Sequence, residues 1–78
     1  MNLQSLAPGE SGFVEKIDMK GGMRRRLMDL GLIEGTRVEC VGAAPSGEPK
    51  AFFIRGAVIA IRKEDCEKII ISGRTVGY

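Results

Sequence analysis

The chain has 78 residues and a formal net charge of +2 at pH 7, with 11 glycines, two cysteines and no histidine. This length supports one small domain with a thin core, and it leaves little room for a deep, water-excluding active site. The mild charge excess is far from the strongly basic composition of dedicated nucleic-acid binders, and the absence of histidine removes the commonest general base and transition-metal ligand.

The N-terminal residues carry no export signal. Residues 1–9 lack the basic and apolar regions of a secretory leader. The longest apolar runs are far shorter than the roughly 20 residues that span a bilayer. We therefore expect a cytoplasmic protein without membrane insertion, whose two cysteines are reduced.

A short helix is predicted at residues 23–30, after a turn at residues 6–10 and a strand at residues 12–17. Met23, Leu27 and Leu30 recur at helical spacing, so we expect this face to pack on a sheet. Gly31 suits the left-handed position that follows a helix, where Leu32 can fold back onto Leu27.

Four further strands are predicted at residues 37–41, 50–55, 57–62 and 69–71. A tight hairpin is expected at Gly56, a proline-bracketed loop at residues 44–49 and one helical turn at residues 63–68. A sheet of five short strands can protect its edges by closing into a barrel. The sequence therefore predicts a mainly β fold, in which a small barrel has one helix between its first two strands. We expect a single domain over residues 1–78, ordered over about 3–72, with a tail at 73–78.

The sequence offers no arrangement of catalytic or metal-binding residues. Cys40 shares a strand face with Val38, which favours a small core residue. Cys66 lies among acidic residues, but a single helical turn rarely directs four donors to one point. The glycines match neither a phosphate-binding loop nor a dinucleotide fingerprint. We expect no enzyme activity, no cofactor and no metal site.

Three consecutive arginines occupy the predicted helix, where the helix dipole disfavours each N-terminal cation by about 0.3–1 kcal/mol. Arg24, Arg25 and Met28 are predicted to lie on its outer side, and Arg26 to border the other edge of the apolar stripe. One interpretation is a solvated face in which Arg25 pairs with Asp29. The other is a docking surface for an acidic partner, which we favour because surface ion pairs contribute so little free energy.

Three segments resemble the FeoA-like family of small cytosolic accessory proteins in prokaryotic ferrous-iron uptake. These are RRRLMDLGLIEGTRV at 24–38, PSGEP at 45–49 and IRGAVIAIRKEDCEKIII at 54–71. The resemblance implies an SH3-like β-barrel without catalysis, and a role in assisting or regulating FeoB, a membrane transporter with a cytosolic G-protein domain. The chain has Glu48 and Ile61 where the family more often has Asp and Leu.

Other functions stay open at this point. The fold expected is similar to the C-terminal SH3-like domain of iron-dependent repressors, which suggests a metal-regulated interaction module, although no helix-turn-helix segment is present. Nucleic-acid binding is not expected, because the chain has few aromatic residues for base stacking: Phe13, Phe52, Phe53 and Tyr78. An open edge strand, or the face that carries Phe53, would allow two copies of the chain to pair.

Overall fold

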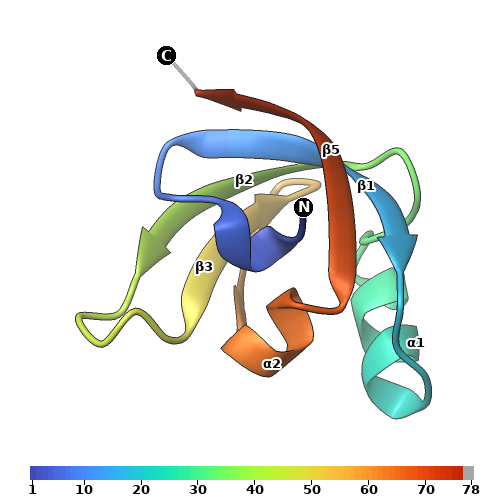
Figure 1. The fold of residues 1–78 in the computed structure, drawn as a ribbon. Helices are drawn as coiled ribbons and strands as arrows, with labels where there is room; N and C mark the ends of the chain where they lie inside the picture. The colour runs from blue at the N-terminus through green and yellow to red at the C-terminus, as the bar shows by residue number, and fades with distance from the viewer. Residues whose placement is uncertain (77–78) are drawn as a thin grey trace.

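The computed structural model describes residues 1–76, and its main element is one antiparallel sheet with the strand order β4-β3-β2-β1-β5 (Figure 1). The elements in chain order are η1 (Leu3–Ser5), β1 (Glu10–Ile17), α1 (Gly22–Asp29), β2 (Arg37–Ala43), β3 (Lys50–Ile54), β4 (Ala57–Ile61), α2 (Lys63–Cys66) and β5 (Ile69–Val76). The predicted fold class is confirmed: five strands, a helix between the first two and a short helix before the last.

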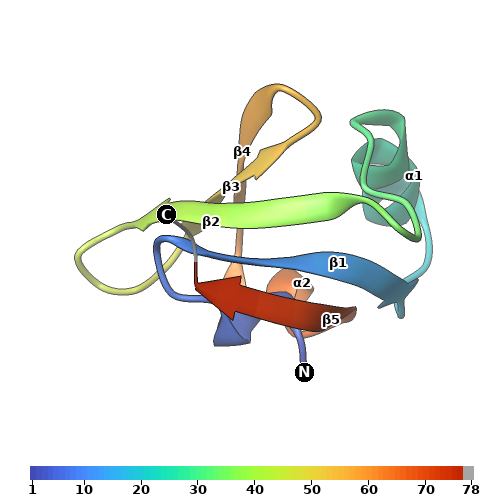
Figure 2. The ribbon, with the colours of Figure 1, turned by 90° about the horizontal axis from the view of Figure 1, so that it is seen from above.

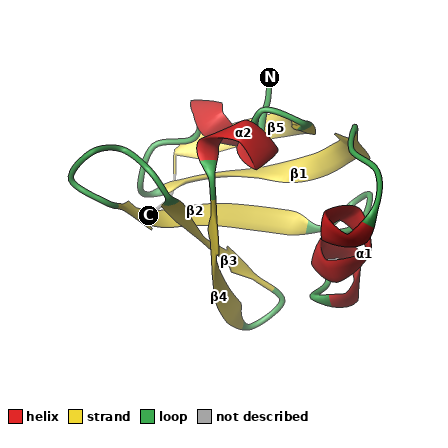
Figure 3. Ribbon diagram, turned by 90° about the horizontal axis from the view of Figure 1, so that it is seen from below, coloured by secondary structure: helices red, strands yellow, loops and turns green. Residues whose placement is uncertain are grey.

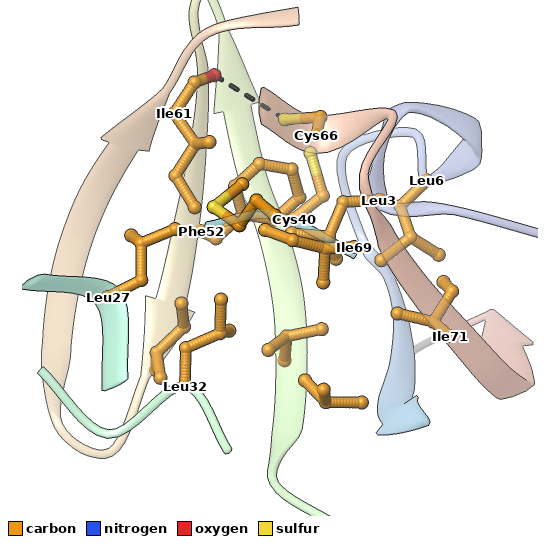
Figure 4. Close-up of a cluster of buried hydrophobic side chains, with 14 residues drawn as sticks. Leu3, Leu6, Leu27, Leu32, Cys40, Phe52, Ile61, Cys66, Ile69 and Ile71 are labelled. Carbon is orange, nitrogen blue, oxygen red and sulfur yellow. Dashed lines mark hydrogen bonds between the residues drawn. The ribbon is translucent and has the colours of Figure 1, made fainter. Parts of the chain in front are cut away.

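The sheet curls around a single core. Seen from above and from below, β3 and β4 cross β1, β2 and β5 at a steep angle, and α1 lies beside the end of the sheet (Figures 2 and 3). The core combines inward-facing residues of all five strands with residues of the helices and the N-terminal segment (Figure 4). Its largest fully buried side chain is Phe52, and Val38, Cys40 and Ile54 beside it are also fully buried, as strand alternation predicts.

The last strand is longer than predicted. β5 continues to Val76, which pairs with Glu10 of β1, so residues 72–76 belong to the sheet and not to a tail. The Ser11 and Thr75 hydroxyls also meet at 2.8 Å across these two strands. The run Ser72-Gly73-Arg74-Thr75 is polar, and nothing in it signals a strand before the pairing with β1 is known. Residues 77–78 of the predicted tail lie outside the described residues.

The N-terminal segment supplies core residues that the sequence analysis did not find. Leu3 in η1 and Leu6 just after it are fully buried, whereas the sequence pattern indicates only a turn that begins at Leu6. The Lys50 ammonium group of β3 holds this segment, since it donates to the carbonyl oxygens of Gln4 and Leu6 at 2.7 and 2.9 Å. Two leucines three residues apart are too short a pattern to predict this position.

The N-terminal segment also covers the start of one sheet edge. β4 and β5 are the two edge strands of the described sheet and do not pair with each other. Asn2 forms a bridge with Ile70, and the Ile71 amide donates to the Met1 carbonyl at 2.9 Å. The N-terminal segment therefore covers the start of β5, one of the two edge strands of the described sheet.

α1 is anchored at its C-terminal end. Gly31 has φ +106°, its amide donates to the Met28 carbonyl at 3.0 Å, and the Leu32 amide donates to the Leu27 carbonyl at 2.9 Å. These are the two hydrogen bonds of a Schellman motif, as predicted. The expected apolar stripe, however, is largely exposed: Leu27 is buried, whereas 36% of Met23 and 40% of Leu30 remain accessible.

The β3–β4 turn reaches the same end of α1. Arg55 and Gly56 form this turn with φ +46° and +84°, so β3 ends one residue earlier than predicted. A Cβ atom placed on Gly31 would lie 2.6 Å from Cδ of Arg55. The aliphatic stem of Arg55 therefore lies directly against the glycine that ends the helix.

Replacement of Gly31 by alanine is expected to destabilise the fold by about 1–2 kcal/mol. The left-handed backbone there disfavours any Cβ atom, and the new methyl group would also displace Arg55. Gly42→Ala is the matched control, because its backbone needs no positive φ and nothing lies within 4 Å of the added Cβ atom. Urea unfolding of both variants measures the difference, and equal stabilities would contradict this account of the helix end.

Candidate functional site

The candidate site is the outer surface of α1, where the sequence places consecutive arginines. Arg24, Arg25 and Arg26 are exposed, and within residues 1–76 none of them lies within 4.0 Å of a carboxylate. The i,i+4 pair of Arg25 with Asp29, weighed as the alternative to docking, is not formed. Arg24 instead donates a hydrogen bond from Nη1 to Sδ of Met28 at 3.2 Å, which holds the thioether beside the guanidinium group.

Three of the four predicted site residues share one hollow. Arg24, Arg25 and Met28 line an open depression of ≈ 610 Å³, together with Gly21, Gly22 and Asp29. We call it the helix hollow. Arg24 and Met28 also line a second depression of ≈ 270 Å³, where Ile17, Ile33 and Glu34 complete the wall. We call this the loop hollow, because Ile33 and Glu34 belong to the connection from α1 to β2.

Arg26 lies apart from the other three residues. It lines a smaller groove of ≈ 170 Å³ between α1 and β4, whose other cation is Arg62. Because α1 has only eight residues, Arg26 already belongs to its last turn, where the helix dipole favours a cation. The structure therefore separates Arg26 from the surface that we had assigned to all three arginines.

The first turn of α1 has none of the usual compensation for the dipole. Its N-cap residue is Gly21, which has no side chain to accept a hydrogen bond, and no acidic residue lies in this turn. Arg24 adds a full positive charge next to backbone amides that already carry partial positive charge. This end of the helix can therefore attract carboxylates, and it contains no nucleophile or base for catalysis.

A third cationic hollow was not found from the sequence. Arg37 at the start of β2 and Arg55 in the β3–β4 turn line a depression of ≈ 330 Å³, with Phe53 as its aromatic wall. The pairing of Glu39 with Phe53 and of Val38 with Ile54 places the start of β2 beside the end of β3, where the turn with Arg55 begins. Strand alternation had placed Phe53 on the outer face, but only the register of β2 and β3 brings the cations to it.

Both cysteines lie in the core. Cys40 is fully buried, which confirms its interpretation as a small core residue. Cys66 is fully buried too, and its Sγ lies 3.5 Å from the Ile61 carbonyl oxygen (Figure 4). Burial raises the pKa of the Cys66 thiol to about 12, an effect that the nearby Lys50 ammonium only partly offsets. Over residues 1–76, no three His, Cys, Asp or Glu side chains are placed to hold a metal ion.

Two of the three phenylalanines are exposed. Phe52 is fully buried, whereas Phe13 and Phe53 are exposed by 46% and 41% on β1 and β3. Tyr78 lies outside the described residues. The expectation that the chain does not bind nucleic acid stays a prediction. No helix within residues 1–76 is long and apolar enough to cross a membrane.

The sequence profile of the FeoA domain matches residues 1–73. A "Fe(2+) transport protein A/Fe(2+) transporter FeoB fusion protein" from Porphyromonas gingivalis is 28% identical over 69 residues, which are 88% of this chain and 8% of the fusion protein. The chain thus spans only a small part of that relative.

Solved structures have the same fold. The solution structure of the FeoA protein from Chlorobium tepidum is 32% identical, with a TM-score of 0.86 over 91% of this chain and 68% of that one. The crystal structure of Stenotrophomonas maltophilia FeoA with zinc, described as a prokaryotic SH3 domain protein, is 26% identical, with a TM-score of 0.84 over 96% and 95%. A manganese-dependent transcriptional repressor, 19% identical over 90% of this chain and 35% of its own, has a TM-score of 0.79 and shows a likeness of fold alone.

The buried Cys66 thiol is expected to make stability fall at alkaline pH. In the unfolded chain the thiol loses its proton above about pH 9, whereas the folded protein keeps it until about pH 12. Between these values the unfolded state is favoured by about 1.4 kcal/mol for each pH unit. Urea unfolding at several pH values measures this slope. Cys66→Ala should unfold more easily at neutral pH but lack this part of the slope, and an unchanged slope would contradict the assignment.

Proposed function

Because this chain belongs to the FeoA domain family, we propose that it is an accessory protein of ferrous-iron transport that docks on the cytosolic part of a FeoB transporter through the outer surface of α1. Members of the family are non-catalytic SH3-like accessory proteins, which agrees with the expectation that the chain is not an enzyme.

The fused relative is the observation that carries the choice of partner. In Porphyromonas gingivalis a domain similar to this chain is part of one polypeptide with the transporter FeoB. A covalent link raises the effective concentration of one domain at the other to about the millimolar range, so even a weak contact between them is occupied. Where the two domains are not linked, the same contact has to form through their surfaces alone.

The exposed arginines are the surface that this proposal assigns to the contact. Arg24 and Arg25 have no carboxylate partner within the described residues, and Met28 lines the helix hollow with them. Arg and Met are both enriched in interfaces, and guanidinium groups pair with carboxylates in bidentate fashion. The acidic groups of the partner would also supply the negative charge that the first turn of α1 lacks.

The fold likeness to a repressor does not favour the alternative of a metal-regulated repressor module. That likeness rests on 19% identity and concerns the fold alone. The docking proposal also differs from it in its readout, because docking alters transporter GTPase activity or iron uptake and not transcription.

Charge reversal at Arg24 and Arg25 is expected to weaken binding to the cytosolic part of the transporter by about 10-fold or more, because two attractive contacts become repulsive. Both side chains are exposed, so the fold should persist, which circular dichroism checks. Arg62→Glu is the matched control: Arg62 is also exposed, its only ion pair within residues 1–76 is a long one of 3.8 Å to Glu64, and it lies outside the helix hollow. Binding is measured by calorimetry with the purified transporter portion.

Fusing the charge-reversed variant to the transporter shows whether the substitutions weaken binding alone or also abolish the function of the bound protein. If Arg24→Glu with Arg25→Glu only weakens docking, then joining that variant to the transporter by a flexible linker should restore iron uptake in cells. Binding and uptake equal to those of the unaltered protein, without any tether, would remove the arginine surface from the proposal.

A further inference from the structure

We propose that the partner surface extends beyond α1 as a track of three adjoining hollows, and that this track takes an extended segment of the transporter that carries both carboxylates and apolar side chains. This inference rests on the proposed function, because it concerns how the same partner is held. It differs from docking on α1 alone by assigning a role to Arg37, Phe53 and Arg55.

The three hollows follow one another along the surface. The helix hollow and the loop hollow share Arg24 and Met28 as lining residues. Glu34 lines the loop hollow, and Gly35, the next residue of the chain, lines the hollow of Arg37 and Arg55. The stem of Arg55 lies against Gly31 at the end of α1, so this third hollow begins where the helix ends.

The charge of the track selects an acidic occupant. It is lined by four arginines and two carboxylates: Arg24, Arg25, Arg37, Arg55, Asp29 and Glu34. Arg37 has a long ion pair of 3.5 Å to Glu39, whereas Arg24, Arg25 and Arg55 have no carboxylate within 4.0 Å in the described part of the chain. Arg37 and Arg55 line the same hollow, where their like charges repel until an anion lies between them.

Apolar side chains also line the track, so its occupant needs apolar residues as well as carboxylates. Met28 and Ile17 are half-buried in the loop hollow, where Ile33 is 38% exposed, and Phe53 is 41% exposed in the third hollow. Aromatic and methionine side chains flanked by arginine are the usual anchors of a protein contact. The occupant therefore has apolar residues between its carboxylates, and a purely acidic chain fits less well.

The dimensions bound the length of the occupant. The longest dimension of the molecule is 32 Å, and an extended chain advances about 3.3 Å per residue. A segment that lies along this surface is therefore no longer than about ten residues. Recognition of a short acidic motif by grouped arginines is an established mode of peptide binding.

Overlapping ten-residue peptides that cover the cytosolic sequence of the transporter test this inference. Each peptide carries a fluorophore, and its binding to the full chain is followed by fluorescence anisotropy. A peptide with two or more carboxylates and an apolar residue is expected to bind. Decaglutamate is the probe for charge alone, and it should bind at least about tenfold more weakly, since it offers nothing to Phe53.

Variants at the far end of the track separate this inference from docking on α1. Arg37→Gln with Arg55→Gln removes both charges and keeps the stem of Arg55 against Gly31, and it should weaken peptide binding about 3- to 10-fold. Phe53→Ser should weaken it about 10-fold. Arg62→Gln, outside the track, is the control and should change binding less than twofold.

The outcomes distinguish the two proposals. If the intact cytosolic portion binds through Arg24 and Arg25, but no peptide binds and the variants at Arg37, Arg55 and Phe53 change nothing, then the track is wrong and docking on α1 stands. If neither the intact portion nor any peptide binds, both proposals are overturned. Peptide binding that is lost in the far-end variants supports the track.

Discussion

The position of α1 depends on the anchoring of its C-terminal end. The helix has eight residues, a glycine N-cap and an arginine in its first turn, so it is too short and too poorly capped to be stable by itself. Its other end is held by the left-handed Gly31, by the buried Leu32 and by the Thr36 hydroxyl, which donates to the Gly31 carbonyl at 3.0 Å. Every side chain of the proposed partner surface on α1 is placed by these contacts.

That anchoring also joins the two cationic parts of the surface. Arg55 lies against Gly31, and Gly35–Arg37 lead from the same region into β2. The arginines of α1 and those of the sheet therefore keep a fixed relation to each other, although they come from different elements. A rigid arrangement of this kind loses little conformational entropy of its own on binding, which favours affinity for a short segment.

The arginine surface is unfavourable for the isolated domain, and this supports a role outside the fold. Arg24 lies in the first turn of α1, where the helix dipole disfavours a cation, and the like charges of Arg37 and Arg55 line one hollow. No core contact requires these charges, since the core consists of apolar side chains and two cysteines. The pattern is typical of residues selected for an interaction at some cost to stability.

The sequence by itself determined the order of the elements, the inward residues of β2 and β3 and the Schellman end of α1, because each follows from spacing within a few residues. It also placed Arg24, Arg25 and Met28 on one side of the helix, since helical geometry is local. Tertiary structure alone decided what lies far apart in the chain: the burial of Leu3 and Leu6 under Lys50, the pairing that extends β5 to Val76, and the cation pair of Arg37 and Arg55. Strand register and chain packing determine these contacts, and neither can be predicted from the spacing of neighbouring residues.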